Sequence, residues 1–193
     1  PLPSKESYLA AADKGISTRL AREAGLDCPL TLYPGNMKQL EQLADTLAFP
    51  LVIKPRKSSG SRGIRVVRNK EEFHRIYREI DHTYPRALIQ EYIPPGTRYD
   101  VCLLYNRNHE LRASFVQQEI RHFPLEMGPS TVQESVWYPE LVEQAGSLMR
   151  KLQWYGVVEI EFMVDCRDGK LKFMEINPRF WNSLYTSILA GVD

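Results

Sequence analysis

Two runs rich in β-branched and aromatic residues, 156–165 and 171–179, flank the dipeptide Asp168-Gly169. Asp-Gly between two such runs predicts a β-hairpin, because glycine tolerates the positive φ that a tight turn requires. The hairpin then fixes which side chains meet. Glu161 should lie roughly opposite Glu175, and Asn177 should share the face of Glu175, two residues further along the strand. The sequence therefore predicts a cluster of oxygen atoms on one sheet face.

Such a cluster suits a hard cation. Mg²⁺ (or Mn²⁺) prefers carboxylate and carbonyl oxygens, and Mg²⁺ usually shares its coordination sphere with substrate phosphates. We expect Glu161, Glu175 and Asn177 to be the metal ligands. A solvent-facing acidic strand is the ordinary alternative, but like charges that face each other across two strands are destabilising without a counter-ion. Glu159 shares the strand face of Glu161 and competes with it as a ligand.

Composition and charge narrow the class of protein. The chain has 193 residues, enough for one large domain or two small ones, and its 43% hydrophobic and 25% charged residues are ordinary for a soluble protein. A formal net charge of +1 gives no electrostatic reason to expect a nucleic-acid or membrane partner. Three scattered cysteines favour reduced thiols and a cytoplasmic location. The chain begins with proline, and we expect a fragment that lacks an N-terminal domain and a C-terminal extension.

The order of the predicted elements indicates an α+β protein with two lobes, residues 1–92 and 93–193. The segment Pro94-Pro95-Gly96 reads as the linker between them. Besides the hairpin, hydrophobic periodicity predicts helices over 13–24, 37–47, 70–80, 139–152 and 182–190, and strands over 29–33, 51–54, 64–67, 87–92, 99–105 and 111–118. Residues 121–135 form a polar connecting segment in this prediction. A cleft between two lobes is a usual place for a ligand.

Lys54 ends an apolar strand immediately before a loop of small and basic residues, 56–63. A buried ammonium group is costly unless an anion pairs with it. Gly60 and Gly63 would let backbone N–H groups approach a phosphate closely. An exposed basic turn is the alternative. The loop fits neither G-x-G-x-x-G nor the Walker pattern, and a protein kinase is disfavoured because its glycine-rich loop precedes the strand lysine.

The order of these features along the chain is Lys14, Lys54 with its loop, Gln90-Glu91, Pro95-Gly96, and finally Glu161 followed by Glu175-Ile-Asn-Pro-Arg179. This order resembles the ATP-grasp superfamily. It is most similar to the branch of carbamoyl-phosphate synthase large subunits and biotin carboxylase. The resemblance covers nearly the whole chain, and the run from Glu175 to Arg179 is its most specific part.

The resemblance implies an ATP-grasp fold with the nucleotide cleft between the two lobes. Arg98 stands where related proteins often carry a ribose-binding acid, so Asp100 or Glu91 is our substitute for that role. The implied phosphate contacts are Lys14 and Lys54, with Arg179 near the γ-phosphate. Ser59, Gly60 and Gly63 would belong to a lid over the phosphates, residues 56–63. The implied adenine contacts are Gln90, Glu91, Tyr92, Ile93 and Met174. Arg179 and Lys54 are the implied catalytic residues.

The function implied is that of an ATP- and Mg²⁺-dependent ligase. A small carboxylate, or bicarbonate, would be activated as an acyl phosphate, and an amine or another nucleophile would then displace phosphate. The alternative is an ATP-binding module, a regulatory subunit or half of a split enzyme, without ligase activity of its own. A purely structural α+β protein is a third possibility. The identities of the acid and the nucleophile are not readable from the sequence, and an oligomer is left open.

Overall fold

The computed structural model describes residues 2–44, 46–123 and 128–192. The chain divides into two compact units. The small unit is Pro29–Pro94, and the large unit combines Pro1–Cys28 with Pro95–Asp193. Helix and strand are both abundant, as the α+β prediction requires. Within the described residues, no helix has the length and apolar character that a membrane span needs.

The large unit is built on a five-stranded antiparallel sheet with the strand order β7-β6-β5-β8-β9. Its strands are β5 (Arg98–Tyr105), β6 (Leu111–His122), β7 (Ser130–Ser135), β8 (Gly156–Val164) and β9 (Leu171–Asn177). Its helices are α1 (Lys5–Ala12), α2 (Lys14–Glu23), α5 (Pro139–Lys151) and α6 (Leu184–Leu189). The Asp168-Gly169 turn joins β8 to β9, with Gly169 at φ 72°, so the predicted hairpin is confirmed.

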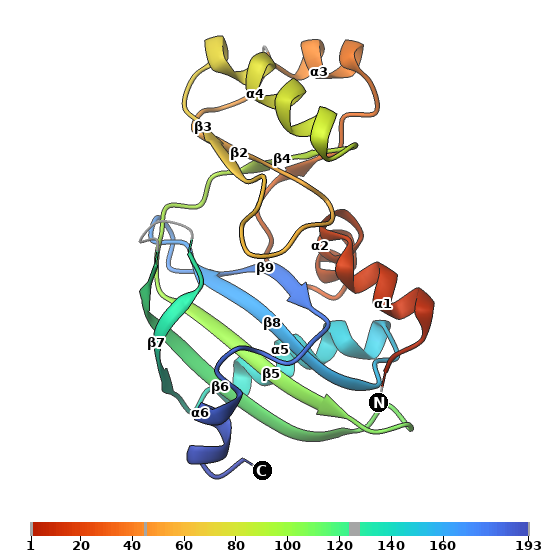
Figure 1. Ribbon diagram of the computed structural model, residues 1–193, viewed down its shortest axis with the longest axis vertical. Coiled ribbons are helices and arrows are strands. Elements are labelled where there is room, and N and C mark those ends of the chain that lie inside the picture. Colours follow the sequence, from red (N-terminus) through yellow and green to blue (C-terminus); the bar gives the residue numbers. More distant parts are fainter. Residues whose placement is uncertain (1, 45, 124–127, 193) are drawn as a thin grey trace. The chain divides into compact units, whose positions relative to one another are not determined.

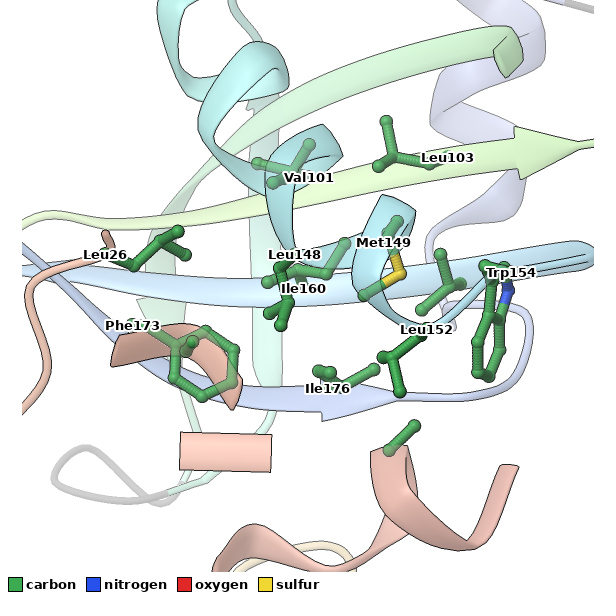
Figure 2. Packing of buried hydrophobic residues seen from close by; sticks show 14 of the residues in the cluster. Leu26, Val101, Leu103, Leu148, Met149, Leu152, Trp154, Ile160, Phe173 and Ile176 are labelled. Carbon is green, nitrogen blue, oxygen red and sulfur yellow. The ribbon is translucent and has the colours of Figure 1, made fainter. Parts of the chain in front are cut away.

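One face of this sheet is apolar and carries the main core. Helix α5 presents Leu148, Met149 and other buried residues to strand residues such as Val101 and Ile160, and Figure 2 shows this packing. Trp154 is fully buried, and its indole N–H donates to the Val157 carbonyl oxygen at 3.2 Å. Because side chains alternate along a strand, the residues between these core positions point to the opposite face, where the polar cluster lies.

Residues 1–28 pack within the large unit, although the sequence prediction placed them in the first lobe with residues 29–92. Two contacts explain the difference: the Phe173 N–H donates to the Asp27 carbonyl oxygen at 2.8 Å, and Lys14 pairs with Glu175 on the same strand. Helix α1 was not predicted, because it has no apolar stripe and buries only Ala11. In the structure, the second boundary between the two units falls between Pro94 and Pro95.

The small unit holds a four-stranded antiparallel sheet with the order β1-β4-β2-β3. Its elements are β1 (Thr31–Leu32), α3 (Met37–Ala44), β2 (Leu51–Lys54), β3 (Arg65–Val67), α4 (Lys70–Thr83) and β4 (Leu88–Glu91). Helices α3 and α4 lie on one face of the sheet (Figure 1) and share with it a core that includes Leu40, Ile53 and Phe73. Asn36 caps α3 by accepting the Gln39 N–H at 2.9 Å, as its position predicted.

The segment 121–135 contains a strand that the sequence did not predict. Residues Ser130–Ser135 form β7 and pair with β6 at the edge of the sheet. The strand is polar and largely exposed on both faces, so no hydrophobic alternation marks it. Residues 124–127 of the same segment lie outside the described part of the chain.

Candidate functional site

Strands β8 and β9 bring the predicted metal ligands together. Glu161 pairs in register with Glu175, and Glu159 pairs with Asn177. The amide Nδ2 of Asn177 donates to Glu161 Oε1 at 2.6 Å. The predicted opposition of the two glutamates across the hairpin is therefore confirmed, and the amide joins them on the same face.

A bulge in β9 shapes this arrangement. Phe162 pairs with Phe173 while Glu161 pairs with Glu175, so Met174 is an extra residue on β9. A bulge redirects neighbouring side chains and occurs often beside active sites. Here it keeps both Phe173 and Ile176 in the core, while Glu175 shares the polar face with Asn177. The sequence predicted a regular strand at Met174.

Lys14 reaches this cluster from α2. Its Nζ lies 2.8 Å from Glu175 Oε2, and its side chain is only 8% exposed. Asp13 caps the helix through hydrogen bonds from the N–H groups of Gly15 and Ile16, which fixes the first turn and the position of Lys14. Lys14 was expected to contact ATP phosphates, and the structure adds an ion pair with a predicted metal ligand.

The polar face continues across β5 and β6 as an acidic cluster, defined here as Asp100, Glu119, Glu159, Glu161 and Glu175. Asp100 pairs in register with Glu161. Burial is the main cause that raises the pKa of Asp100 to about 6, of Glu119 to about 7 and of Glu159 to about 8. Burial and the neighbouring Glu175 also hold the pKa of Glu161 well above its ordinary range. Burial therefore favours the protonated form of these carboxyl groups.

Basic side chains lie at the margin of the acidic cluster. Arg179 Nη1 is 3.5 Å from Glu159 Oε2, although 47% of the arginine side chain is exposed. Arg98, which stands where an acid was expected, lies 3.9 Å from Glu119 Oε2. Glu159, the competing ligand, is thus opposite Asn177 and beside the predicted catalytic arginine.

The donor set fits a hard divalent cation. Glu161, Glu175 and Asn177 supply oxygen atoms on one face, and burial together with the neighbouring carboxylates raises the pKa values of Glu159 and Glu161, which a bound cation would counteract. Across the described residues, no three His, Cys, Asp or Glu side chains form a metal-binding group by themselves. The predicted set has two carboxylates and one amide, so it needs the waters and phosphate oxygens that Mg²⁺ usually keeps.

The small unit carries Lys54 and the loop 56–63. Lys54 ends β2 and is 5% exposed, whereas Ser59 and Gly60 are exposed. Arg62 donates from Nε to the Ser59 carbonyl oxygen at 3.1 Å and from Nη2 to its hydroxyl at 3.0 Å, which orders the loop locally. Gly60 has φ 60° and open space around it. The loop therefore presents backbone at Gly60, as a phosphate-binding lid would require.

Gly63 has a packing reason to be glycine. A Cβ atom there would lie 2.7 Å from Pro55 Cγ and 2.7 Å from Tyr84 Cε2, and its φ is 78°. A larger residue at Gly63 would disturb the small unit itself. The contact of Gly63 with ATP remains a prediction. A substitution at Gly60 tests the loop with less effect on packing, because a Cβ atom there meets no other atom within 4 Å.

The predicted adenine-binding segment 90–93 ends β4. Gln90 is buried, and its Nε2 donates to Thr31 Oγ1 at 2.9 Å. The Glu91 N–H donates to the Leu30 carbonyl oxygen at 2.8 Å, which extends the pairing with the segment before β1. Tyr92 and Ile93 follow the last strand residue. Their predicted contact with the edge of the adenine base, through backbone groups, remains a prediction.

Two residues of the polar face were not found from the sequence. Gln117 on β6 donates from Nε2 to Asp100 Oδ2 at 2.7 Å, and its Oε1 accepts from the Ser183 hydroxyl at 2.7 Å. No local pattern marks either residue, since glutamine in a strand and serine after a loop are both ordinary. Asp100 is 4% exposed, and its predicted contact with the ribose remains a prediction.

Comparison with known proteins defines the family. The family model for the ATP-grasp domain matches residues 11–183, and the chain therefore belongs to the ATP-grasp family. Among curated relatives, biotin carboxylase 1 of Bacillus subtilis is 24% identical over an alignment of 209 positions, gaps included, which covers 99% of this chain and 45% of that protein. D-alanine–D-alanine ligase A of Mesorhizobium japonicum is 26% identical, over 94% of this chain and 56% of that protein.

Solved structures agree on the fold. Biotin carboxylase from Campylobacter jejuni superimposes with a TM-score of 0.86 at 18% identity, over 99% of this chain and 46% of that one. The biotin carboxylase domain of Hydrogenobacter thermophilus 2-oxoglutarate carboxylase gives a TM-score of 0.80 at 21% identity, over 97% of this chain and 44% of that one. The predicted ATP-grasp fold is confirmed. The chain spans roughly half or less of the length of these carboxylases.

Proposed function

We propose that this chain is the ATP- and Mg²⁺-binding part of a ligase that activates a carboxylate, or bicarbonate, as an acyl phosphate. The observation that carries the proposal is the pairing of Glu161 with Glu175 and Asn177, with Lys14 on Glu175. Carboxylates held this close, in partly buried surroundings, favour a bound cation. Family membership supports ATP-dependent carboxylate ligation as the general chemistry.

Three groups of residues would bind different parts of ATP and its metal ion. Glu161, Glu175 and Asn177 would hold Mg²⁺, which when bound offsets the negative charge of the β- and γ-phosphates. Lys14, from the large unit, and Lys54, from the small unit, would add positive charge to the phosphates. The loop 56–63 would cover them through the backbone around Gly60. Phosphoryl transfer depends chiefly on positioning and charge neutralisation, which these groups are suited to provide.

The remaining assignments concern the base and the reacting groups. Tyr92 and Ile93 would bind the adenine edge through backbone atoms, with Met174 against its face. Arg179 would approach the γ-phosphate or the acyl phosphate. In the reaction, a carboxylate oxygen attacks the γ-phosphorus and ADP leaves. The nucleophile then attacks the acyl carbon, and inorganic phosphate leaves.

The acid substrate and the nucleophile belong to the proposal only as classes. The Hydrogenobacter structure was determined with MgADP, ADP and bicarbonate, which supports bicarbonate as one candidate acid. The D-alanine–D-alanine ligase relative supports a carboxylate with an amine as another. A panel of both kinds of acid, each with and without an amine, is therefore the right assay for turnover.

The test compares Glu175→Gln with the unsubstituted protein. Calorimetric titration with the non-hydrolysable analogue AMP-PNP should show binding that Mg²⁺ strengthens, and the substitution should weaken the Mg²⁺-dependent part at least tenfold. Glu143→Gln, which changes an exposed carboxylate on α5, is the matched control. Mg²⁺-independent binding in both proteins would refute the metal assignment. Nucleotide binding without ADP release across the substrate panel would favour a binding module over a ligase.

A further inference from the structure

A polar row crosses the sheet of the large unit at one register. Gln117 on β6 pairs with Asp100 on β5, Asp100 pairs with Glu161 on β8, and Glu161 pairs with Glu175 on β9. Residues that pair directly across strands point to the same face of a sheet. The row therefore links a neutral amide at one end to the predicted metal ligands at the other.

Gln117 uses both halves of its amide group. It is 1% exposed, its Nε2 donates to Asp100 Oδ2 at 2.7 Å, and its Oε1 accepts from the Ser183 hydroxyl at 2.7 Å. Burying an amide costs free energy that its hydrogen bonds only offset, so an apolar side chain would serve packing at least as well. The two bonds instead fix the orientation of the groups at either end.

Those two groups belong to different parts of the site. Asp100 is the carboxylate opposite Glu161, and the bond from Gln117, together with a side-chain hydrogen bond to Glu119, orients Asp100 toward the metal-binding pair. Ser183 lies in the segment between β9 and α6, which also carries Arg179. A single side chain on β6 therefore forms hydrogen bonds to both Asp100 in the polar row and the segment that carries Arg179, the predicted catalytic arginine.

We propose that Gln117 is a positioning residue of the metal and phosphate site, which orients Asp100 beside Glu161 and ties the segment of Arg179 to the sheet through Ser183. The proposal rests on the proposed function, because it needs a cation at Glu161 and Glu175. Gln117 is not among the predicted ligands of the cation or of ATP. Its effect passes through Asp100 and Ser183, as the hydrogen-bond partners of metal-binding groups commonly act.

The test measures Mn²⁺ binding in the presence of AMP-PNP, from the loss of the electron paramagnetic resonance signal of free Mn²⁺. Gln117→Leu keeps the approximate size of the side chain and removes both hydrogen bonds. We expect it to weaken Mn²⁺ binding about tenfold. Ser183→Ala, which removes one bond, should give a smaller loss in the same direction. Gln118→Leu is the matched control, since the next residue on β6 faces the opposite side of the sheet.

Thermal unfolding separates positioning from stability. A purely structural Gln117 would lower the melting temperature and leave the Mn²⁺ affinity of the folded protein unchanged, and that result would overturn the proposal. If Gln117→Leu fails to fold, Ser183→Ala decides: an affinity equal to that of the unsubstituted protein refutes the positioning role. If the unsubstituted protein binds no Mn²⁺ with AMP-PNP, the proposed function fails and the positioning role fails with it.

Discussion

Replacing Glu159 with glutamine should make the metal-free protein more stable, by an amount that grows with pH. Glu159 is buried beside Asp100, and burial is the chief reason that its pKa rises from 4.5 to about 8. The folded protein therefore keeps this carboxyl group protonated up to about pH 8, whereas the unfolded chain releases the proton near pH 4.5. Between these values the folded state holds the extra proton, so stability is present at low pH and falls as pH rises.

The size of the effect follows from the two pKa values. A pKa raised from 4.5 to about 8 corresponds to about 5 kcal/mol of lost stability once the pH exceeds both values. This figure is an upper bound, because Asp100 and Glu119 titrate together with Glu159 and share the penalty. Glutamine also gives up the ion pair with the exposed Arg179, which contributes about 1 kcal/mol or less. We expect Glu159→Gln to gain about 2 to 3 kcal/mol at pH 8.5.

The assay is urea unfolding with EDTA, from pH 5 to pH 8.5, on the unsubstituted protein, Glu159→Gln and the exposed control Glu143→Gln. The stability difference should be small at pH 5 and largest at pH 8.5 for Glu159→Gln, and flat for the control. A variant that is less stable at pH 8.5, or a difference independent of pH, would refute the reasoning. Saturating Mg²⁺ with AMP-PNP should also flatten the pH dependence of the unsubstituted protein, because a cation favours the ionised carboxylates.

Two further predictions concern the large unit. Gly96→Ala should destabilise the large unit by about 2 to 4 kcal/mol, since the added Cβ would lie 2.1 Å from the Val164 carbonyl oxygen. Thermal melting followed by circular dichroism measures this loss. The control is Gly169→Ala, whose added Cβ meets open space and should cost about 1 kcal/mol. Lys14→Met should lower the stability of the metal-free protein by about 2 kcal/mol, because Glu175 loses its partner. The double variant Lys14→Met/Glu175→Gln should recover part of that loss in a double-mutant cycle, and strict additivity of the two single effects would argue against the ion pair.

The hairpin shows how much of the site the sequence could predict. The turn at Asp168-Gly169 was enough to bring Glu161 near Glu175, and alternation beyond the bulge put Asn177 on the face of Glu175, whereas the exact pairing of Glu161 with Glu175 depends on the bulge at Met174. The order of Lys14, Lys54 and the motif ending at Arg179 was enough to indicate the family. Both inferences depend only on spacing along the chain, which the sequence states directly.

The features that were missed depend on contacts between distant residues. The proposed role of Gln117 comes from its hydrogen bonds to Asp100 and Ser183. Asp100 lies on β5, and Ser183 lies in the segment after β9. The polar edge strand β7 pairs with β6 without any hydrophobic pattern of its own. The bulge at Met174 arises because Phe173 and Ile176 must both reach the core, a requirement of packing that periodicity does not contain.

The division of the large unit into two chain segments has a consequence for how the protein is made. The small unit is an insertion, and its two ends meet where the Glu91 N–H donates to the Leu30 carbonyl oxygen. It can therefore complete its sheet as soon as β4 has been synthesised. Lys14, in contrast, must wait for Glu175 near the other end of the chain. The small unit is thus expected to fold first during translation, and the proposed Mg²⁺ site is expected to form only when β9 has left the ribosome.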